Sequence, residues 1–134
     1  MLKKFDCLDL KKGKWSRWPE MLQKRDELAV ALGPDGKVYA IGGYGGGGTP
    51  TPNSSEVALD SSNGQVDASS STTKPQPQSN CLRTAERFDF NTNQWEKLPD
   101  MNEARRALAA VALPDGIYAI GGYDGKQYLS SVEK

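Results

Sequence analysis

The sequence contains no histidine and only two cysteines, Cys7 and Cys81. Histidine is the usual general base and the commonest metal ligand, so a catalytic triad or a zinc-type site is not expected within these 134 residues. Two cysteines could form a disulfide, but nothing else in the sequence indicates a secreted, disulfide-stabilised domain. We therefore expect two free thiols and a reducing, cytoplasmic location.

The sequence also has no excess of charge and no long apolar run. Its 17 basic and 17 acidic side chains give a formal net charge of +0, so no long-range field favours nucleic acid or an anionic membrane. No apolar run approaches the roughly 18 residues that span a bilayer. We expect neither a nucleic-acid partner nor a membrane partner.

Large apolar side chains are scarce in the middle of the chain, over residues 45–81. This segment holds four consecutive glycines (Gly45–Gly48), four prolines and the run Ser69–Thr73, and it has no aromatic residue. Such a composition cannot bury enough apolar surface to offset the entropy lost on ordering. We expect a disordered low-complexity insertion, which a host domain tolerates because extra loop length costs little free energy.

Two copies of one pattern flank this segment. Ala40–Tyr44, with the sequence Ala-Ile-Gly-Gly-Tyr, recurs as Ala119–Tyr123, and a Pro-Asp-Gly turn precedes each copy at Pro34–Gly36 and Pro114–Gly116. Other residues recur 80 positions apart, namely Trp15 and Trp95, Met21 and Met101, and Arg25 and Arg105. Without the insertion of roughly 32 residues the period is about 48, and a period of this size is typical of propeller blades.

Alternating short apolar runs between turn residues predict β-strands outside the insertion. The two Pro-Asp-Gly sequences predict hairpin turns. The run 28–32 is apolar at every position, which predicts a strand covered on both faces. The expected strands are residues 5–10, 15–18, 28–32, 38–41, 84–90, 94–98, 107–113, 117–120 and 128–134.

The repeated residues resemble the Kelch repeat. The Kelch unit has a Gly-Gly pair after its second strand, an aromatic-Asp pair in its third, a Trp six residues later, and a Pro-x-Met-x-x-x-Arg run that enters the next blade. The matching residues are Gly42-Gly43 and Gly121-Gly122, Phe88-Asp89, Asp9 with Trp15, Asp89 with Trp95, Pro19–Arg25 and Pro99–Arg105.

The resemblance implies an all-β fold, namely a fragment of a Kelch-type β-propeller with about two four-stranded antiparallel blades. Residues 1–44 are expected to form a first Kelch unit, a partial blade plus strands of the next. Residues 82–134 are expected to form a second unit and the start of a third. The sequence departs from the family at Ala29 and Ala109, where Gly is common, and at Leu8, where an aromatic residue is common.

The number of blades also departs from the family, since Kelch propellers close with about five to seven blades. Each blade buries its faces against its neighbours, so about two blades leave apolar faces open. We expect these faces to be covered by further blades in cis or by self-association.

Residues that recur in every unit are expected to pack between blades rather than to bind one partner. The expected structural residues are Trp15, Trp95, Gly42, Gly43, Gly121, Gly122, Tyr39 and Tyr118. The Gly-Gly pairs are not read as phosphate cradles, because no Lys-Ser/Thr and no strand-to-helix turn follows them.

In Kelch proteins partners usually dock on one face, which is built by two sets of loops. In this sequence these loops are residues 22–27 and 102–106, and residues 44–82 and 123–129. The expected partner-binding residues are Arg25, Arg105, Arg106, Tyr44, Tyr123, Asp124, Lys126 and Tyr128. They combine aromatic and charged side chains, which are favoured at binding hot spots on loops. Because Arg25 and Arg105 recur, the alternative that each makes a structural hydrogen bond to a neighbouring turn also stays open.

The resemblance implies a module that binds a protein partner, with substrate recognition for a ubiquitin ligase as the first function. Actin binding and a non-functional structural fragment of a longer propeller are the alternatives. Some copper oxidases have Kelch-type propellers, but their copper needs His and Tyr ligands. With no histidine, we expect no metal, no cofactor and no enzyme activity.

Overall fold

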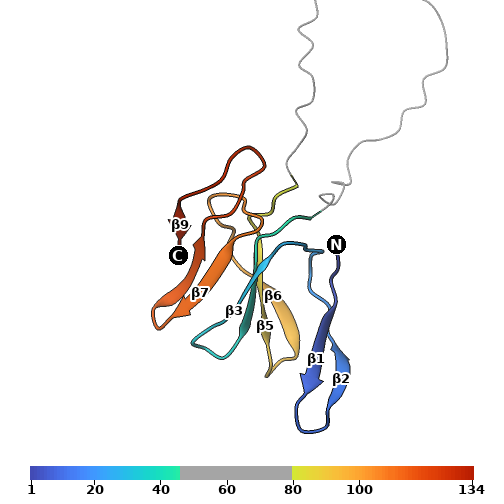
Figure 1. Ribbon diagram of the computed structural model, residues 1–134. Coiled ribbons are helices and arrows are strands. Elements are labelled where there is room, and N and C mark those ends of the chain that lie inside the picture. Colours follow the sequence, from blue (N-terminus) through green and yellow to red (C-terminus); the bar gives the residue numbers. More distant parts are fainter. Residues whose placement is uncertain (46–79) are drawn as a thin grey trace, which may run out of the picture. The chain divides into compact units, whose positions relative to one another are not determined.

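The computed structural model describes residues 1–45 and 80–134, which form one compact unit. The insertion expected at residues 45–81 lies outside the described residues apart from its ends. Nine β-strands and no helix occur in the described part of the chain (Figure 1). The expected all-β class is therefore confirmed.

The strands form three antiparallel sheets, in the orders β1-β2, β3-β4-β5-β6 and β7-β8-β9. The strands are β1 (Phe5–Asp9), β2 (Lys14–Trp18), β3 (Ala29–Leu32), β4 (Val38–Ile41), β5 (Ala85–Asp89), β6 (Gln94–Lys97), β7 (Ala109–Leu113), β8 (Gly116–Ile120) and β9 (Val132–Glu133). Their order matches two outer strands, one complete four-stranded blade, and three strands of the next blade. The expected strand 128–134 is shorter than predicted, because Tyr128 pairs with Tyr123 inside a loop.

The complete blade joins strands from both sides of residues 46–79. β4 pairs with β5 in a register that places Val38 opposite Phe88 and Ile41 opposite Ala85. Side chains alternate between the two faces of a strand, so this register sends Phe88 toward β1-β2 and Ala85 toward β7-β9. The blade thus has one apolar face for each neighbouring sheet.

Aspartates close the turns at one end of the sheets. Asp9 Oδ1 accepts the backbone N–H groups of Lys11 and Lys12 at 2.9 and 3.0 Å, and Asp89 Oδ1 accepts that of Asn91 at 2.8 Å. An aspartate side chain that bonds to the backbone two residues ahead forms an Asx turn. The Asp of the aromatic-Asp motif is therefore a turn former in both copies.

An aromatic cluster fills the space between β1-β2 and the complete blade. Phe88 is fully buried, and its ring lies 5.1 Å from that of Phe5 and 5.4 Å from that of Trp95. The Trp95 Nε1–H donates to the Pro19 carbonyl at 2.8 Å, so the buried indole N–H has a hydrogen-bond acceptor. Burial of one such Phe side chain contributes about 1.5–3 kcal/mol, so this contact holds the two sheets together.

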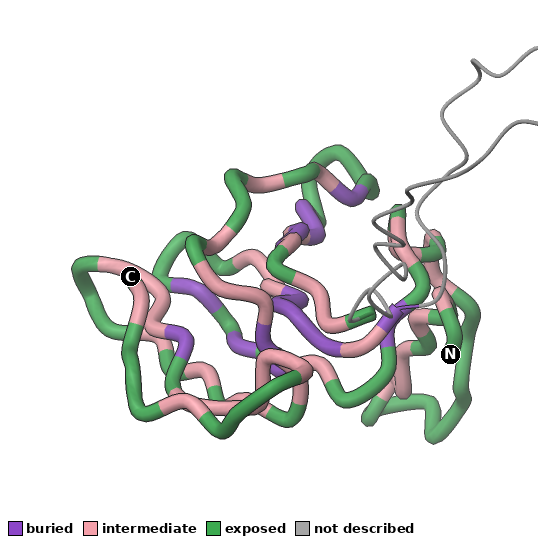
Figure 2. Tube along the Cα trace, turned by 90° about the horizontal axis from the view of Figure 1, so that it is seen from above, coloured by how far each residue is buried: buried purple, intermediate pink, exposed green. Residues whose placement is uncertain are grey.

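A second, smaller apolar cluster lies between the complete blade and β7-β9. Its buried members are Ile41, Ala85 and Ala119, and partly buried side chains surround them. The buried residues lie mainly in the interior of the described unit, as Figure 2 shows, and the two clusters join residues of adjacent sheets. Packing between sheets, not within one sheet, therefore supplies most of the core.

The expectation that residues 28–32 are covered on both faces is wrong. Ala29 and Ala31 are buried, whereas Val30 and Leu32 are 58% and 65% exposed. Val30 and Leu32 lie on the face of the complete blade that meets β1-β2, as their pairing with Ala40 and Val38 shows. The two strands β1 and β2 cover only the Phe88 side of that face, so the β3 side stays open.

Candidate functional site

Two pairs of loops meet at the end of the strands that is opposite the Pro-Asp-Gly turns. Tyr44 and Asp26 exchange backbone hydrogen bonds of 2.6 and 2.9 Å, and Tyr123 and Arg106 exchange bonds of 2.9 and 3.0 Å. The two pairs are equivalent positions of the repeat. The fold therefore brings Tyr44, Arg106 and Tyr123 to one surface, although they are far apart in the sequence.

Arg106 organises the side chains on this surface. Its guanidinium carbon lies 5.6 Å from the centre of the Tyr44 ring and 5.1 Å from that of Tyr123. Arg106 Nη1 also donates to Glu27 Oε2 at 3.2 Å. The Tyr123 ring lies 5.2 Å from that of Tyr128, which is 88% exposed. We refer to Glu27, Tyr44, Arg106, Tyr123 and Tyr128 as the tyrosine–arginine cluster.

A hollow of about 550 Å³ opens beside the cluster. It is lined by Glu27, Arg106, Ala107, Tyr123, Lys126, Gln127 and Tyr128. Cation–π contacts at exposed sites contribute about 0.5–1 kcal/mol each, so Arg106 is held in place before any partner arrives. The hollow therefore presents aromatic walls, with the charge of Arg106 paired with Glu27 and the positive charge of Lys126 beside them.

Asp124 shapes the loop rather than offering a free charge. Its Oδ1 accepts the backbone N–H groups of Gln127 and Lys126 at 2.8 and 2.6 Å, and these bonds hold the pKa of the Asp124 carboxyl below its usual value. Gly125 has a φ of 101°, which allows the tight turn. Asp124 thus positions Lys126 and Tyr128, a role that differs from the expected direct contact with a partner.

Glu27 belongs to the site although the sequence analysis did not single it out. Glu27 and Ala107 are 80 positions apart, and both have a φ of 49°. Residues other than glycine in this region cost about 1–3 kcal/mol and occur where the surrounding structure enforces them. The Ala107 N–H donates to the Glu27 carbonyl at 2.9 Å, which links the two loops. The repeat spacing was the signal that could have paired them.

The expectation that Arg25 and Arg105 contact a partner is wrong, because both are buried. They are 3% and 0% exposed. Arg25 Nη1 donates to the carbonyls of Gly42 and Thr84, both at 2.8 Å. A side chain with so little exposed surface cannot reach a partner, so the structural alternative holds for both.

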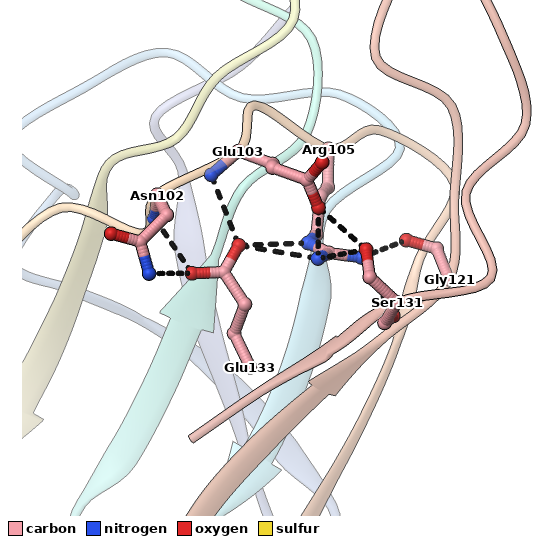
Figure 3. Close-up of polar contacts among 6 residues, drawn as sticks. All are labelled: Asn102, Glu103, Arg105, Gly121, Ser131 and Glu133. Carbon is pink, nitrogen blue, oxygen red and sulfur yellow. Dashed lines mark hydrogen bonds and ion pairs between the residues drawn. The ribbon is translucent and has the colours of Figure 1, made fainter.

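Arg105 repeats this arrangement in the next sheet (Figure 3). Its Nη1 donates to the carbonyls of Gly121 and Ser131 at 2.8 and 3.0 Å, and its Nη2 lies 3.2 Å from Glu133 Oε1. Glu133 also accepts the backbone N–H groups of Asn102 and Glu103 at 2.7 and 3.0 Å. The pair therefore fixes the loop that enters β7 against β8 and β9.

The carboxylates of Glu86, which is buried, and of Glu133, which is partly buried, respond differently to these surroundings. Burial raises the pKa of Glu86, although Arg25 Nη2 lies 3.6 Å from Glu86 Oε2 and opposes the shift. Burial also lowers the pKa of Arg25. Burial works against the charged form of Glu133 too, but the N–H groups of Asn102 and Glu103 and the guanidinium of Arg105 outweigh it, so the pKa of Glu133 is lowered.

The Gly-Gly pairs sit where loops pass close to the strand ends. Gly43 has a φ of 100°, and a Cβ added there would lie 2.5 Å from the Asp26 carbonyl oxygen. A Cβ at Gly42 would lie 2.5 Å from the Arg105 carbonyl oxygen, and one at Gly122 would lie 2.7 Å from that of Arg106. The close approach of two backbones therefore explains why glycine is needed at these positions beneath the tyrosine–arginine cluster.

The repeated aromatic residues have unequal surroundings. Trp95 is 8% exposed and packs between two sheets, whereas its counterpart Trp15 is 70% exposed, so the packing of Trp15 between blades stays a prediction. Trp95 faces β1-β2, but Trp15 lies on the outer face of β1-β2, which stays open. Tyr39 and Tyr118 are half-buried and donate to Asp35 and Asp115 at 2.9 and 2.8 Å, so they brace the Pro-Asp-Gly turns.

The described part of the chain holds no group of three or more His, Cys, Asp or Glu side chains that could bind a metal ion. None of its elements is a helix of the length and apolarity that a membrane span requires. Cys7 and Cys81 are not joined in a disulfide.

Comparison with known proteins identifies the repeated unit. The Kelch motif matches residues 73–102 and 104–134. Kelch-like protein 8 of Caenorhabditis elegans is 40% identical over 50 residues, which are 37% of this chain and 7% of that protein. Kelch-like protein 28 of Homo sapiens is 49% identical over 46 residues, which are 34% of this chain and 8% of that protein. The matched segment is thus less than a tenth of either relative.

A solved structure shares the fold. It is described as a novel fungal alcohol oxidase of the AA5 family in complex with copper, and the match has a TM-score of 0.60 and 17% identity over 95% of this chain and 23% of that one. At this identity the likeness extends to the fold alone. The two motif matches, the Kelch-like relatives and the antiparallel sheets together show that this chain is a Kelch repeat protein and a fragment of a β-propeller.

Proposed function

We propose that the chain is a protein-interaction module that binds a protein partner through the tyrosine–arginine cluster. The observation that carries the proposal is the position of Arg106 between the rings of Tyr44 and Tyr123, next to the exposed Tyr128. Tyr and Arg are enriched at the centres of protein interfaces, where rigid side chains lose little entropy on binding. The cluster combines both residue types on loops of a rigid scaffold.

The surroundings of the cluster favour a partner segment with an aromatic or acidic side chain. Lys126 provides positive charge, since that of Arg106 is shared with Glu27, and the rings of Tyr123 and Tyr128 provide apolar walls to the hollow. Asp124 and Gly125 hold the loop in one conformation, so binding needs little further ordering. Tyr128 is the most exposed large side chain of the cluster and is its main contact residue in this proposal.

Within this class, substrate recognition for a cytoplasmic ubiquitin ligase is the function we favour, and actin binding is the second candidate. The family resemblance supports both, and in Kelch proteins both functions usually involve further domains. A third candidate is a purely structural fragment. The open faces of β3 and β7-β9 support it, because further blades in cis, or a second copy, would bury them.

Tyr128→Ala tests the proposal, and Leu10→Ala is its matched control. Leu10 is 87% exposed in the turn between β1 and β2, remote from the cluster, so both changes remove a large exposed side chain. Proteins retained by the immobilised chain are quantified for each variant. We expect Tyr128→Ala to lose at least one specific partner by tenfold or more and Leu10→Ala to keep it, because loss of a hot-spot residue costs about 2 kcal/mol or more.

The identity of the lost partner selects among the functions. A ubiquitin-ligase substrate or actin would support the corresponding candidate. Equal retention of every partner by wild type and Tyr128→Ala would contradict the cluster as the binding site. Retention of no specific partner by wild type would favour the structural fragment.

A further inference from the structure

The Glu27 side chain bonds to Arg106 across two loops that are 79 residues apart in the sequence. Glu27 Oε2 accepts a hydrogen bond of 3.2 Å from Arg106 Nη1. Within the described residues, no hydrogen bond uses Nε or Nη2 of the same guanidinium. The side chains of Glu27 and Arg106 are 45% and 36% exposed, and both line the hollow beside the cluster. A side chain of a partner in the hollow can therefore reach the ion pair.

The position of Arg106 does not depend on Glu27 alone. The guanidinium carbon lies 5.6 Å from the centre of the Tyr44 ring and 5.1 Å from that of Tyr123. Cation–π contacts with two rings hold the guanidinium on the surface, and a single exposed ion pair adds little to this. Arg106 should therefore stay on the rings when the Glu27 carboxylate moves away.

The repeat shows that the backbone at residue 27 does not need a glutamate. Its counterpart Ala107 has the same φ of 49° and carries only a Cβ. The counterpart of Arg106 is Asp26, whose Oδ1 accepts the backbone N–H of Glu27 at 3.0 Å. The ion pair between Glu27 and Arg106 is thus confined to one of the two equivalent places. We therefore attribute the Glu27 carboxylate to the binding surface and not to the architecture of the blade.

The contact that Glu27 makes is weaker than the best contact a guanidinium can make. A guanidinium has five N–H donors in a planar fork, which matches the two oxygens of a carboxylate, and charge-assisted bonds of this kind are about 2.7–2.9 Å long. Glu27 makes a single bond of 3.2 Å to one nitrogen. A second carboxylate that approached Arg106 would be repelled by Glu27, because like charges at close range disfavour each other. Glu27 and an incoming carboxylate therefore compete for the same guanidinium.

We propose that Glu27 is an internal competitor for Arg106, and that an acidic side chain of the partner displaces it on binding. The inference rests on the proposed function of the tyrosine–arginine cluster. Without a partner, Glu27 neutralises Arg106, so an isolated anion gains little at this surface. A partner that also contacts Tyr128 offsets the loss of the Glu27 contact. Glu27 thus acts as a specificity determinant, because repulsion of the wrong ligands contributes to selectivity as attraction of the right one does.

Two defined peptides test the competition, namely triglutamate and triglutamine with both ends blocked. Each peptide is titrated into the isotope-labelled 134-residue chain, and the shifts of its resonances give a dissociation constant. Glu27→Gln should bind triglutamate about threefold or more tightly than the wild type does, because the variant loses one repelling charge but keeps the length of the side chain. The affinity for triglutamine should be the same in both proteins, which a purely structural effect of the substitution would not produce.

Glu20→Gln is the matched control for net charge. Glu20 is also exposed, and among the carboxylates of the described residues Arg106 pairs with Glu27 alone. Glu20→Gln should bind triglutamate as the wild type does. In an Arg106→Ala background, Glu27→Gln should bring no gain, because the guanidinium for which the carboxylates compete is absent. Circular dichroism confirms that each variant is folded.

Four results would overturn the competitor: no gain in Glu27→Gln, an equal gain in Glu20→Gln, a gain that persists without Arg106, or no binding of triglutamate to any variant. The binding site itself is tested separately by Tyr128→Ala. Loss of the partner in Tyr128→Ala together with no gain in Glu27→Gln would overturn the role of Glu27 and leave the proposed function standing.

Discussion

The Glu133 carboxylate lies 3.2 Å from Nη2 of Arg105, and the two groups together fix the loop that enters β7. The arginine also bonds to two backbone carbonyls, and the glutamate accepts two backbone N–H groups. Arg25 and Glu86 form the same arrangement in the first copy. Arg25 lies 80 residues before Arg105, but Glu86 lies only 47 residues before Glu133, because the insertion falls between Arg25 and Glu86. The recurrent arginine of the Pro-x-Met-x-x-x-Arg run is therefore an internal anchor beneath the binding loops.

Loss of this anchor should destabilise the chain strongly. Arg105→Ala leaves the Glu133 carboxylate without its cation and two carbonyls without their donor, and removal of one partner of a buried ion pair costs about 3–5 kcal/mol. The free energy of unfolding from urea denaturation measures the loss. Arg106→Ala is the control, because Arg106 is partly exposed. Its bridge to Glu27 is worth about 0–1 kcal/mol, and its contacts with the rings of Tyr44 and Tyr123 about 0.5–1 kcal/mol each. Similar losses in both variants would show that Arg105 is not an anchor.

The two carboxylates should give opposite pH dependences. The pKa of Glu133 is lowered in the folded state, so its contribution is present above the unfolded value of about 4.3 and is lost as the pH falls through the folded value. The pKa of Glu86 is raised, so its contribution is present below about 4.3 and is lost as the pH rises through the folded value.

Glutamine variants separate the two contributions. Glu133→Gln should reduce the loss of unfolding free energy between about pH 5 and pH 3, and Glu86→Gln should steepen that loss, because it removes a group that stabilises at acid pH. Urea denaturation at several pH values gives both slopes. Slopes that change in the same direction in the two variants would contradict the assigned pKa directions.

The strands and turns were predictable because they depend on local chemistry. Asp9, Asp89 and the Pro-Asp-Gly turns act within a few residues of themselves, and the alternating strands bury one face. Whether the face of a strand is buried does not depend on the local sequence alone. Val30 lies in an apolar run that looks buried on both sides, yet its exposure is set by how many strands the neighbouring sheet has. Trp15 and Trp95 have the same local pattern and opposite burial for this reason.

Gly43 should tolerate no side chain. Gly43→Ala places a Cβ 2.5 Å from a backbone carbonyl oxygen at a φ of 100°, so both strain and a clash result. Gly13→Ala is the matched control, since Gly13 has a φ of 62° and nothing lies within 4 Å of the added Cβ. Gly13→Ala should cost only the left-handed strain of about 1–2 kcal/mol, and Gly43→Ala should cost clearly more. Thermal unfolding compares them, and equal shifts would contradict the close approach.

The two tryptophans should differ in their contribution to stability. Trp95→Ala leaves a cavity beside Phe88 and should cost about 3–5 kcal/mol. Trp15→Ala should change the free energy of unfolding by about 0.5 kcal/mol or less, because the side chain is exposed. Urea denaturation of both variants checks this. A large loss in Trp15→Ala would mean that Trp15 packs within the chain.

The candidate site was predictable in part. Tyr44, Arg106, Tyr123 and Tyr128 were chosen as non-repeating or aromatic loop residues, and the structure brings them together. Arg25 and Arg105 share the loops but point inward, and residue type alone gives no direction. Glu27 was missed because an isolated glutamate in a charged loop resembles any solvated residue. Its relation to Ala107 depends on the packing of consecutive units.

Ala107 should be more stable as glycine, in contrast to most positions in the chain. Its φ of 49° is strained for an alanine, and its N–H bond to the Glu27 carbonyl holds it there. Glycine adopts this conformation freely, so Ala107→Gly should relieve about 1–2 kcal/mol of strain. The greater backbone entropy that glycine loses on folding should offset about 0.5–1 kcal/mol of this gain. Ala110→Gly, in strand β7, supplies only the entropy cost and should destabilise. Thermal unfolding should therefore move the two variants in opposite directions, and a lower midpoint for Ala107→Gly would show that the left-handed backbone beneath the tyrosine–arginine cluster stores no strain.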